Sequence, residues 1–159
     1  MKKKISPQAM QIAGYLHDWL EHHVPSIKAC SQHTKRNYHV SLTLYAEFLR
    51  TAKGITPETL DSDCFCIKRI EEWIVWLKNA RNCSPATCNV RLSAIRAFLK
   101  YMSDRDISFV SVFLQAENVP NEKTFKRKVV GLSKQAVDTL LSVPNQRTTI
   151  GFRDYTLML

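Results

Sequence analysis

Two segments of the sequence carry basic, hydroxyl and amide side chains at the spacing of one helix face. At 100° per residue, the stripe in the first segment consists of Arg36, His39, Thr43 and Arg50, with Lys35 beside it. The stripe in the second segment consists of Asn89, Ser93, Arg96 and Lys100, and Thr87 precedes it by two residues. Lys and Arg contact phosphates, and Asn, Ser and Thr hydrogen-bond phosphates or base edges. The two stripes therefore predict a DNA-binding surface, although a solvated helix face would show the same pattern.

A third basic group lies in a polar stretch that contains Pro120. Its members are Lys123, Lys126, Arg127 and Lys128. Clustered cations of this kind suit contact with the phosphates of a duplex, so we expect Lys126, Arg127 and Lys128 to bind DNA. A flexible, solubilising connector would have the same composition.

The charge balance of the chain favours an anionic polymer as its partner. Lys and Arg number 23 against 14 Asp and Glu, which gives a formal net charge of +9. Such an excess suits nucleic acid better than a membrane. The sequence has no apolar run of the roughly 20 residues that cross a bilayer. Residues 1–4 are basic, but polar residues rather than an apolar signal core follow them, which argues against a secretory signal.

The cysteines and histidines predict neither disulfides nor a metal site. The five cysteines are odd in number and fit no disulfide framework, so we expect a cytoplasmic protein whose cysteines are small buried hydrophobes. His22, His23, Cys30 and His33 lie close in sequence, but structural zinc prefers paired Cys-x₂₋₄-Cys and His-x₃₋₅-His spacings. The sequence also lacks a phosphate-binding glycine loop, a Gly-x-Ser-x-Gly elbow and a His-Glu-x-x-His motif. We therefore expect no metal, no cofactor and no small-molecule substrate.

The elements that must position the two stripes are helices. Apolar residues recur at helical spacing, and only four Gly and six Pro argue against an all-β protein with many tight turns. The expected helices cover residues 7–23, 34–52, 65–80, 85–103 and 107–115. Ser31 or Thr34 suits the N-cap of the second helix, and Ser84 followed by Pro85 opens the fourth. We expect Pro25 and Ser26 to stop the first helix.

The last 27 residues have the pattern of two further helices. Ser133 suits the N-cap of a short amphipathic helix that Pro144 ends. A final helix opens near Gly151 and is still apolar at Leu159, without a C-cap or a polar tail. This pattern predicts the opening part of a larger domain. The expected organisation is a DNA-binding domain over 1–115, a basic linker over 116–132 and a truncated domain over 133–159.

Four signatures in this order resemble the tyrosine recombinases of the phage integrase family. Ser31-Gln-His-Thr-Lys-Arg-Asn-Tyr38 resembles the opening of their core-binding domain, and Ser84-Pro-Ala-Thr87 with Arg91-Leu-Ser-Ala-Ile-Arg-Ala-Phe98 resembles its last major helix. The segments 132–141 and 151–155 are similar to the two helices that open the catalytic domain, most closely in integrases of mobile elements. The resemblance implies a four-to-five-helix, SAM-like, all-α bundle that forms half of a C-shaped clamp. Its second and fourth helices would face double-stranded DNA, on which other recombinase protomers also bind.

The same resemblance implies which chemistry this chain lacks. Family enzymes cleave DNA with a late tyrosine, aided by two Arg, a Lys and His residues around the phosphate. The first of these Arg residues lies in a Thr-Gly-x-Arg turn after the helix that begins at Arg153-Asp154, and the chain ends before such a turn. We therefore expect no catalytic residue here and a packing role for Tyr155. The alternative from another class is a helical protein–protein or dimerisation module that uses Trp73, Trp76 and the C-terminal helix.

Overall fold

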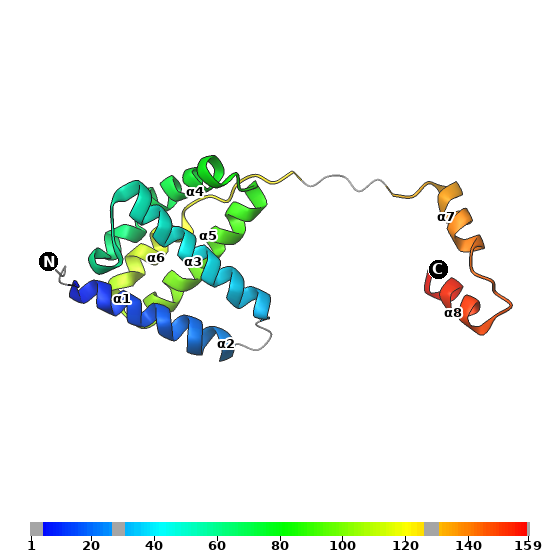
Figure 1. The fold of residues 1–159 in the computed structure, drawn as a ribbon, viewed down its shortest axis with the longest axis horizontal. Helices are drawn as coiled ribbons and strands as arrows, with labels where there is room; N and C mark the ends of the chain where they lie inside the picture. Colours follow the sequence, from blue (N-terminus) through cyan, green and yellow to red (C-terminus); the bar gives the residue numbers. More distant parts are fainter. Residues whose placement is uncertain (1–4, 27–30, 126–130, 159) are drawn as a thin grey trace. The chain divides into compact units, whose positions relative to one another are not determined.

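The computed structural model describes residues 5–26, 31–125 and 131–158, and these form helices joined by short connections (Figure 1). Within these ranges no strand occurs, so the all-α fold class is confirmed. The chain divides into two compact units, 1–124 and 125–159. The helices of the first unit are α1 (Pro7–Asp18), a π-helical turn (Trp19–His23), α2 (Val24–Ser26), α3 (Gln32–Lys53), α4 (Ile67–Arg81), α5 (Pro85–Ser103) and α6 (Val110–Glu117). Short 3₁₀ turns cover Pro57–Thr59, Ser62–Phe65 and Ile107–Phe109.

Side-chain caps fix where α3 and α5 begin. Ser31 Oγ accepts from the main-chain N–H of Thr34 at 3.2 Å, and Ser84 Oγ accepts from that of Thr87 at 3.3 Å. Both bonds satisfy amides that have no partner within the helix. At its C-terminal end, α3 stops at Gly54, whose φ of 67° is the left-handed conformation that glycine adopts without strain. The predicted boundaries of these two helices are confirmed to within a few residues.

The first helical segment runs three residues further than the predicted end at residue 23. After Asp18 the chain makes a π-helical turn and then continues helically through Pro25 to Ser26. A proline ring normally clashes with the carbonyl four residues earlier, and the wider turn, in which the N–H of Val24 bonds to the carbonyl of Trp19, relieves that clash.

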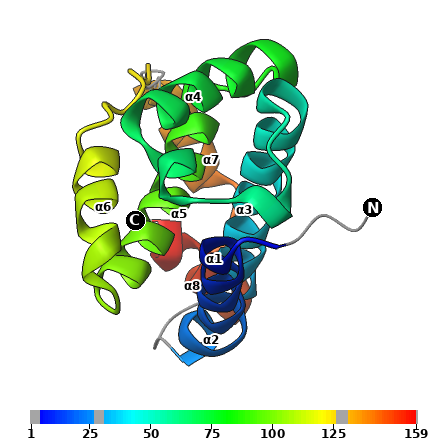
Figure 2. The ribbon, with the colours of Figure 1, turned by 90° about the vertical axis from the view of Figure 1, so that its left-hand side faces the viewer.

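The core of the first unit is built around α5. Figure 2 shows this helix in the middle of the bundle, between α3 and α6. Its inward residues are fully buried and include Cys88, Leu92, Ile95, Phe98, Leu99 and Met102. Trp19 stacks on Tyr38 of α3 with ring centroids 4.8 Å apart and lies 5.3 Å from the ring of Phe98, which joins three elements. Stacked aromatic groups at these distances add packing energy beyond the area they bury.

Trp73 of α4 belongs to this core rather than to a contact surface. Its side chain is 0% exposed, and its ring meets that of Tyr45 edge-on at 4.9 Å. Trp76 is half-buried between Phe48 and the guanidinium of Arg81. The alternative in which Trp73 forms a protein-binding patch is therefore wrong at that residue.

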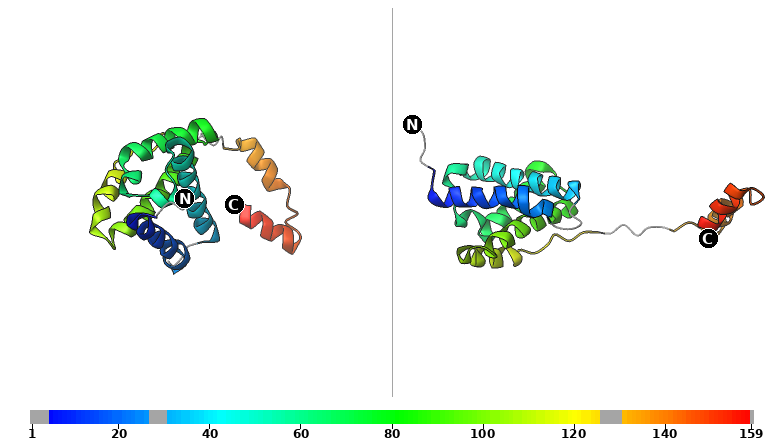
Figure 3. Two further views of the ribbon diagram at one scale, coloured as in Figure 1. Left: turned by 60° about the vertical axis from the view of Figure 1, so that its left-hand side comes forward. Right: turned by 90° about the horizontal axis from the view of Figure 1, so that it is seen from below.

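The second unit contains α7 (Lys134–Ser142) and α8 (Thr149–Met158), which Figure 3 shows as two short helices joined by one loop. Ser133 caps α7, as expected, by accepting from the N–H of Ala136 at 3.2 Å. Gly151 is required, because a Cβ atom there would lie 2.1 Å from the carbonyl oxygen of Asn145. Several large apolar side chains of this unit are exposed, among them Leu140, Val143, Ile150, Phe152 and Leu157. In neither unit is a described helix both long and apolar enough to cross a bilayer.

Candidate nucleic-acid interface

The outer face of α3 carries the first polar stripe. Arg36, His39, Thr43 and Arg50 are all exposed, as the helical spacing predicts. They are held there because Tyr45, Phe48 and Leu49 on the opposite face are buried. The hydroxyl of Thr43 donates to the carbonyl of His39 at 2.9 Å, which leaves its oxygen free to accept a further hydrogen bond.

Lys35 differs from the rest of this stripe. Its ammonium nitrogen lies 2.9 Å from a carboxylate oxygen of Glu21 in the π-helical turn. This hydrogen bond and the ammonium charge lower the pKa of Glu21. Lys35 therefore ties the first helical segment to α3, and a phosphate would have to compete with Glu21 for it.

Arg91 joins α5 to α3 where the two helices cross. Its Nη1 atom donates to the carbonyl of Asn37 and to the hydroxyl of Ser41, both at 3.2 Å. Figure 1 shows the two helices crossing, with their N-terminal ends on the same side of the bundle. A shallow hollow of about 290 Å³ lies at this place, lined by Asn37, Ala86, Thr87, Val90 and Arg91.

Sequence reasoning missed Arg91 as a site residue, because at 100° per residue it falls at the edge of the core stripe of its helix, on the side away from the polar stripe. A sequence signal for Arg91 does exist. It is an arginine within two turns of the helix start at Ser84-Pro85, on the side of α5 that packs against α3.

The second polar stripe is only partly open. Ser93 and Lys100 are exposed, whereas Asn89 and Arg96 are half-buried. The amide of Asn89 bonds to the main chain of Glu122, and the guanidinium of Arg96 bonds to carbonyls at the end of α6. Helical spacing identified the polar face of α5 but not the cover that α6 and the following segment place on it. The prediction that Asn89 and Arg96 are exposed is therefore wrong. A direct contact of either side chain with DNA stays a prediction.

The remaining predicted residues are spread along the surface of the first unit or lie outside the described ranges. Lys100 is 3.2 Å from a carboxylate oxygen of Asp104, and its ammonium lies over the ring of Phe113 at 5.7 Å. The Ser93 hydroxyl donates to the carbonyl of Asn89 at 2.9 Å. Lys123 is exposed. Lys126, Arg127 and Lys128 fall outside the described residues.

Of the histidines and cysteines that lie close in sequence, His23 packs its ring against that of Tyr101 with centroids 4.8 Å apart, and Cys30 lies outside the described residues. The π-helical turn instead brings together His17, Asp18 and His22, whose ligand atoms lie within 4.8 Å of one another. The wider turn places His17 and His22 on one face with four residues between them, which lies within the His-x₃₋₅-His spacing of zinc motifs. All three side chains are exposed, and resident metal sites usually orient their ligands through buried hydrogen-bond partners.

Two of the cysteines behave as the sequence predicts. Cys64 and Cys88 are buried, and burial raises the pKa of the Cys64 thiol to about 11 and raises that of Cys88. Neutral thiols of this kind are poor nucleophiles and poor metal ligands.

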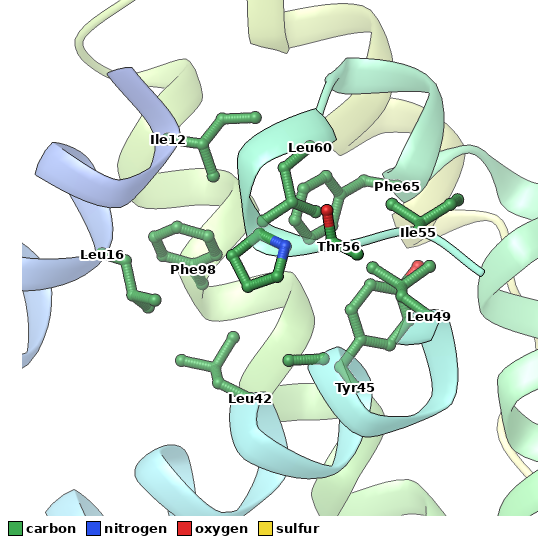
Figure 4. Close-up of a pocket in the computed structure, with 12 residues that line it drawn as sticks. Ile12, Leu16, Leu42, Tyr45, Leu49, Ile55, Thr56, Leu60, Phe65 and Phe98 are labelled. Atoms are coloured by element: carbon green, nitrogen blue, oxygen red, sulfur yellow. The ribbon is translucent and has the colours of Figure 1, made fainter. Parts of the chain in front are cut away.

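An apolar hollow lies between α1, α3 and the connection after α3 (Figure 4). Its volume of about 60 Å³ is far below the roughly 300 Å³ at which small-molecule sites begin. Ile12, Leu42, Leu60 and Phe98 are among the residues that line it. The hollow is therefore a packing feature and not a cofactor site.

The family model for the phage integrase N-terminal SAM-like domain matches residues 16–106, which contain the π-helical turn and all of α3, α4 and α5. The chain belongs to this family. The SAM-like match therefore covers both crossing helices and Arg91, and it ends before α6.

Proteins similar to this SAM-like chain are named as recombinases. The integrase/recombinase y4rD of Sinorhizobium fredii is 26% identical over 148 residues, which cover 93% of this chain and 53% of that protein. The integrase/recombinase y4rC of the same organism is 24% identical, over 83% of this chain and 40% of its own length. The tyrosine recombinase XerC of Chlamydia caviae is 24% identical, over 86% of this chain and 46% of its own length. The chain thus spans about half the length of these curated relatives. No solved structure matches it.

Proposed function

We propose that this chain is the DNA-binding portion of a site-specific tyrosine recombinase or integrase, which grips duplex DNA through α3 and α5. The family and the names of its relatives support DNA integration and recombination as the activity of the whole protein. We assign no catalytic role to any described residue.

The observation that carries the proposal is the Arg91 bridge between α5 and α3. Because Arg91 bonds to Asn37 and Ser41, the N-terminal halves of both helices stand at a fixed crossing. Exposed Arg36 and half-buried Thr87 lie on these halves. The positive end of each helix dipole favours an anion, and an α-helix fits the major groove of B-DNA. We therefore propose that the duplex lies along α3 and α5 and contacts this crossing.

The side chains of the proposed surface divide into two roles. Arg36, Arg50 and Lys100 neutralise phosphates, and Lys35 can do so in competition with Glu21. Thr43 and Ser93 donate their hydroxyl protons to their own helices, so toward DNA they act as acceptors for the amino groups of adenine or cytosine. His39 and Thr87 add polar contacts, and the group Lys123, Lys126, Arg127 and Lys128 continues along the phosphates. Other protomers of the recombinase would bind beside this one on the same DNA.

The dependence of binding on salt tests this function. If the chain neutralises phosphates, log K for a duplex falls with log[salt] by about 0.9 for each phosphate contacted. Fluorescence anisotropy with a labelled duplex at several salt concentrations measures this slope. The alternative is a helical protein–protein module, and it retains the exposed apolar residues of the second unit such as Phe152 and Leu157. Hydrophobic association tolerates or gains from added salt, so duplex-independent self-association that strengthens with salt would favour that alternative.

A further inference from the structure

The segment that follows α6, residues 118–122, is bonded to side chains of α5 before the second unit begins. We call these residues the exit segment. Residues 118–122 have no regular secondary structure beyond a turn, but side chains of α4 and α5 hold them at several points. Ala116 and Val119 are buried, with 0% and 4% of their surface exposed, so this exit segment is anchored by packing as well.

Asn89 fixes the far end of the exit segment. Its Nδ2 donates to the carbonyl of Glu122 at 2.9 Å, and its Oδ1 accepts from the N–H of Glu122 at 2.7 Å. The amide thus satisfies both main-chain groups of one residue, which only an amide side chain in this orientation can do. Lys78 of α4 adds an ion pair to the same residue, with 2.9 Å between its Nζ and a carboxylate oxygen of Glu122.

Arg96 fixes the near end. Its Nε donates to the carbonyl of Ala116 at 3.0 Å, its Nη1 donates to Oδ1 of Asn121 at 3.1 Å, and its Nη2 donates to the carbonyl of Val119. The last carbonyls of a helix have no partner within it and carry the negative end of its dipole, which a guanidinium with five donors suits. The side chain of Arg96 is only 17% exposed, so these bonds are largely shielded from water.

We propose that Asn89 and Arg96 are positioning residues that fix the point at which the chain leaves the DNA-binding bundle. The connector to the second unit then begins at Lys123, the first residue of the basic group, rather than at the end of α6. A connector of residues 123–132 spans at most about 35 Å, whereas one freed from residue 118 onward would span at most about 50 Å. By the usual length dependence, the shorter tether raises the effective concentration of the second unit roughly twofold. Any effect of this shorter connector on DNA binding rests on the proposed function, but the anchoring of the exit segment does not.

Amide exchange measured by NMR on the full chain tests the anchoring directly. In Asn89→Leu we expect the Glu122 amide to exchange at least tenfold faster, while amides in the middle of α3 and α5 keep their protection. Ser93→Ala is the matched control, because Ser93 is exposed one turn along the same helix and bonds only to its own helix. An unchanged Glu122 amide, or a loss of protection spread evenly over the bundle, would overturn the proposal.

A conservative variant separates positioning from simple folding. Arg96→Lys keeps the charge but loses the planar fork, so we expect the bond after Glu117 to become sensitive to a glutamate-specific protease while the urea midpoint of the bundle changes little. If Arg96→Lys and wild type resist cleavage after Glu117 equally, the role given to Arg96 is contradicted.

DNA binding distinguishes this proposal from the proposed function. If Asn89→Leu loses duplex affinity while the Glu122 amide is unchanged, Asn89 contacts DNA and the positioning role is wrong. If Arg36→Glu keeps full duplex affinity while the Glu122 amide responds as expected, the proposed function fails and the anchoring stands.

Discussion

The guanidinium of Arg91 lies 3.2 Å from the main-chain oxygen of Asn37, a residue 54 positions earlier in the chain. This one bond sets α5 against α3 in the first third of each helix. Because the neighbouring bond to Ser41 uses the same Nη1 atom, the guanidinium cannot move without breaking both. The surface proposed for DNA therefore depends on a residue that is half-buried and does not lie on either polar stripe.

Removing the Arg91 bridge should weaken the bundle. Arg91→Met keeps the length of the side chain but leaves the carbonyl of Asn37 and the hydroxyl of Ser41 without this donor. We expect the free energy of unfolding to fall by about 1–3 kcal/mol in urea denaturation. Arg36→Met is the control, since Arg36 is exposed and should change it by less than about 0.5 kcal/mol. Equal stability of the two variants would show that the bridge contributes nothing.

Trp73 should matter for stability and not for association. Trp73→Ala removes a fully buried ring that packs on Tyr45, so we expect a loss of about 3–5 kcal/mol in the free energy of unfolding. Trp73→Phe should cost less, because the indole N–H has no partner among the described residues and its removal leaves no bond broken. Thermal and urea unfolding of both variants measure this order, and a Trp73→Ala variant as stable as wild type would contradict the burial.

The ion pair between Glu72 and Lys53 should make the stability of the folded protein depend on pH. The hydrogen bond from the Lys53 ammonium, 2.8 Å away, lowers the pKa of the Glu72 carboxyl, with a contribution from Arg69. A carboxyl group whose pKa is lowered by folding stabilises the folded protein at pH values above its unfolded pKa of about 4.3. This stabilisation is lost as the pH falls through the lower pKa of the folded state. The stability difference between wild type and Glu72→Gln should therefore be present at pH 7 and vanish on acidification.

Glu71→Gln is the matched control for this ion pair, because Glu71 is the exposed neighbour on the same helix. Urea denaturation at pH 7 and at pH 3 compares the two variants. A pH-independent difference for Glu72→Gln, or the same difference for Glu71→Gln, would show that the ion pair does not act as described.

The buried thiols should resist alkylation in the folded protein. Burial raises the pKa of Cys64 to about 11, so almost none of it is thiolate at pH 8. We expect half-buried Cys66 and Cys83 to react with iodoacetamide first, and Cys64 and Cys88 only after denaturation. Mass spectrometry of the labelled peptides assigns each site. Labelling of Cys64 as fast as Cys66 under native conditions would contradict its burial.

Local signals were enough to predict α3 and α5 from the sequence. Ser31 and Ser84 cap the starts of the two helices, and Gly54 ends α3. All three act through bonds to residues nearby in the sequence, so they can be recognised without knowledge of the tertiary fold. The stripe of α3 followed from the same periodicity, because its side chains at Arg36, His39, Thr43 and Arg50 are exposed.

The features that sequence reasoning missed depend on contacts between distant segments. The polar face of α5 carries the correct residues, but Asn89 and Arg96 meet a segment more than 20 positions away. Arg91 was overlooked because its partners lie on another helix. The continuation of the first helix through Pro25 depends on a π-helical turn, which helical periodicity does not encode.

The most direct test compares Arg36→Glu with Lys68→Glu in duplex binding. Both variants change the net charge equally, and both residues are exposed, but Arg36 lies on the proposed surface of α3 while Lys68 lies in the first turn of α4. We predict that Arg36→Glu weakens the affinity at low salt at least tenfold and reduces the salt slope by about one, whereas Lys68→Glu stays within about twofold of wild type. Equal losses in the two variants, or no loss in either, would contradict the assignment of this surface to DNA.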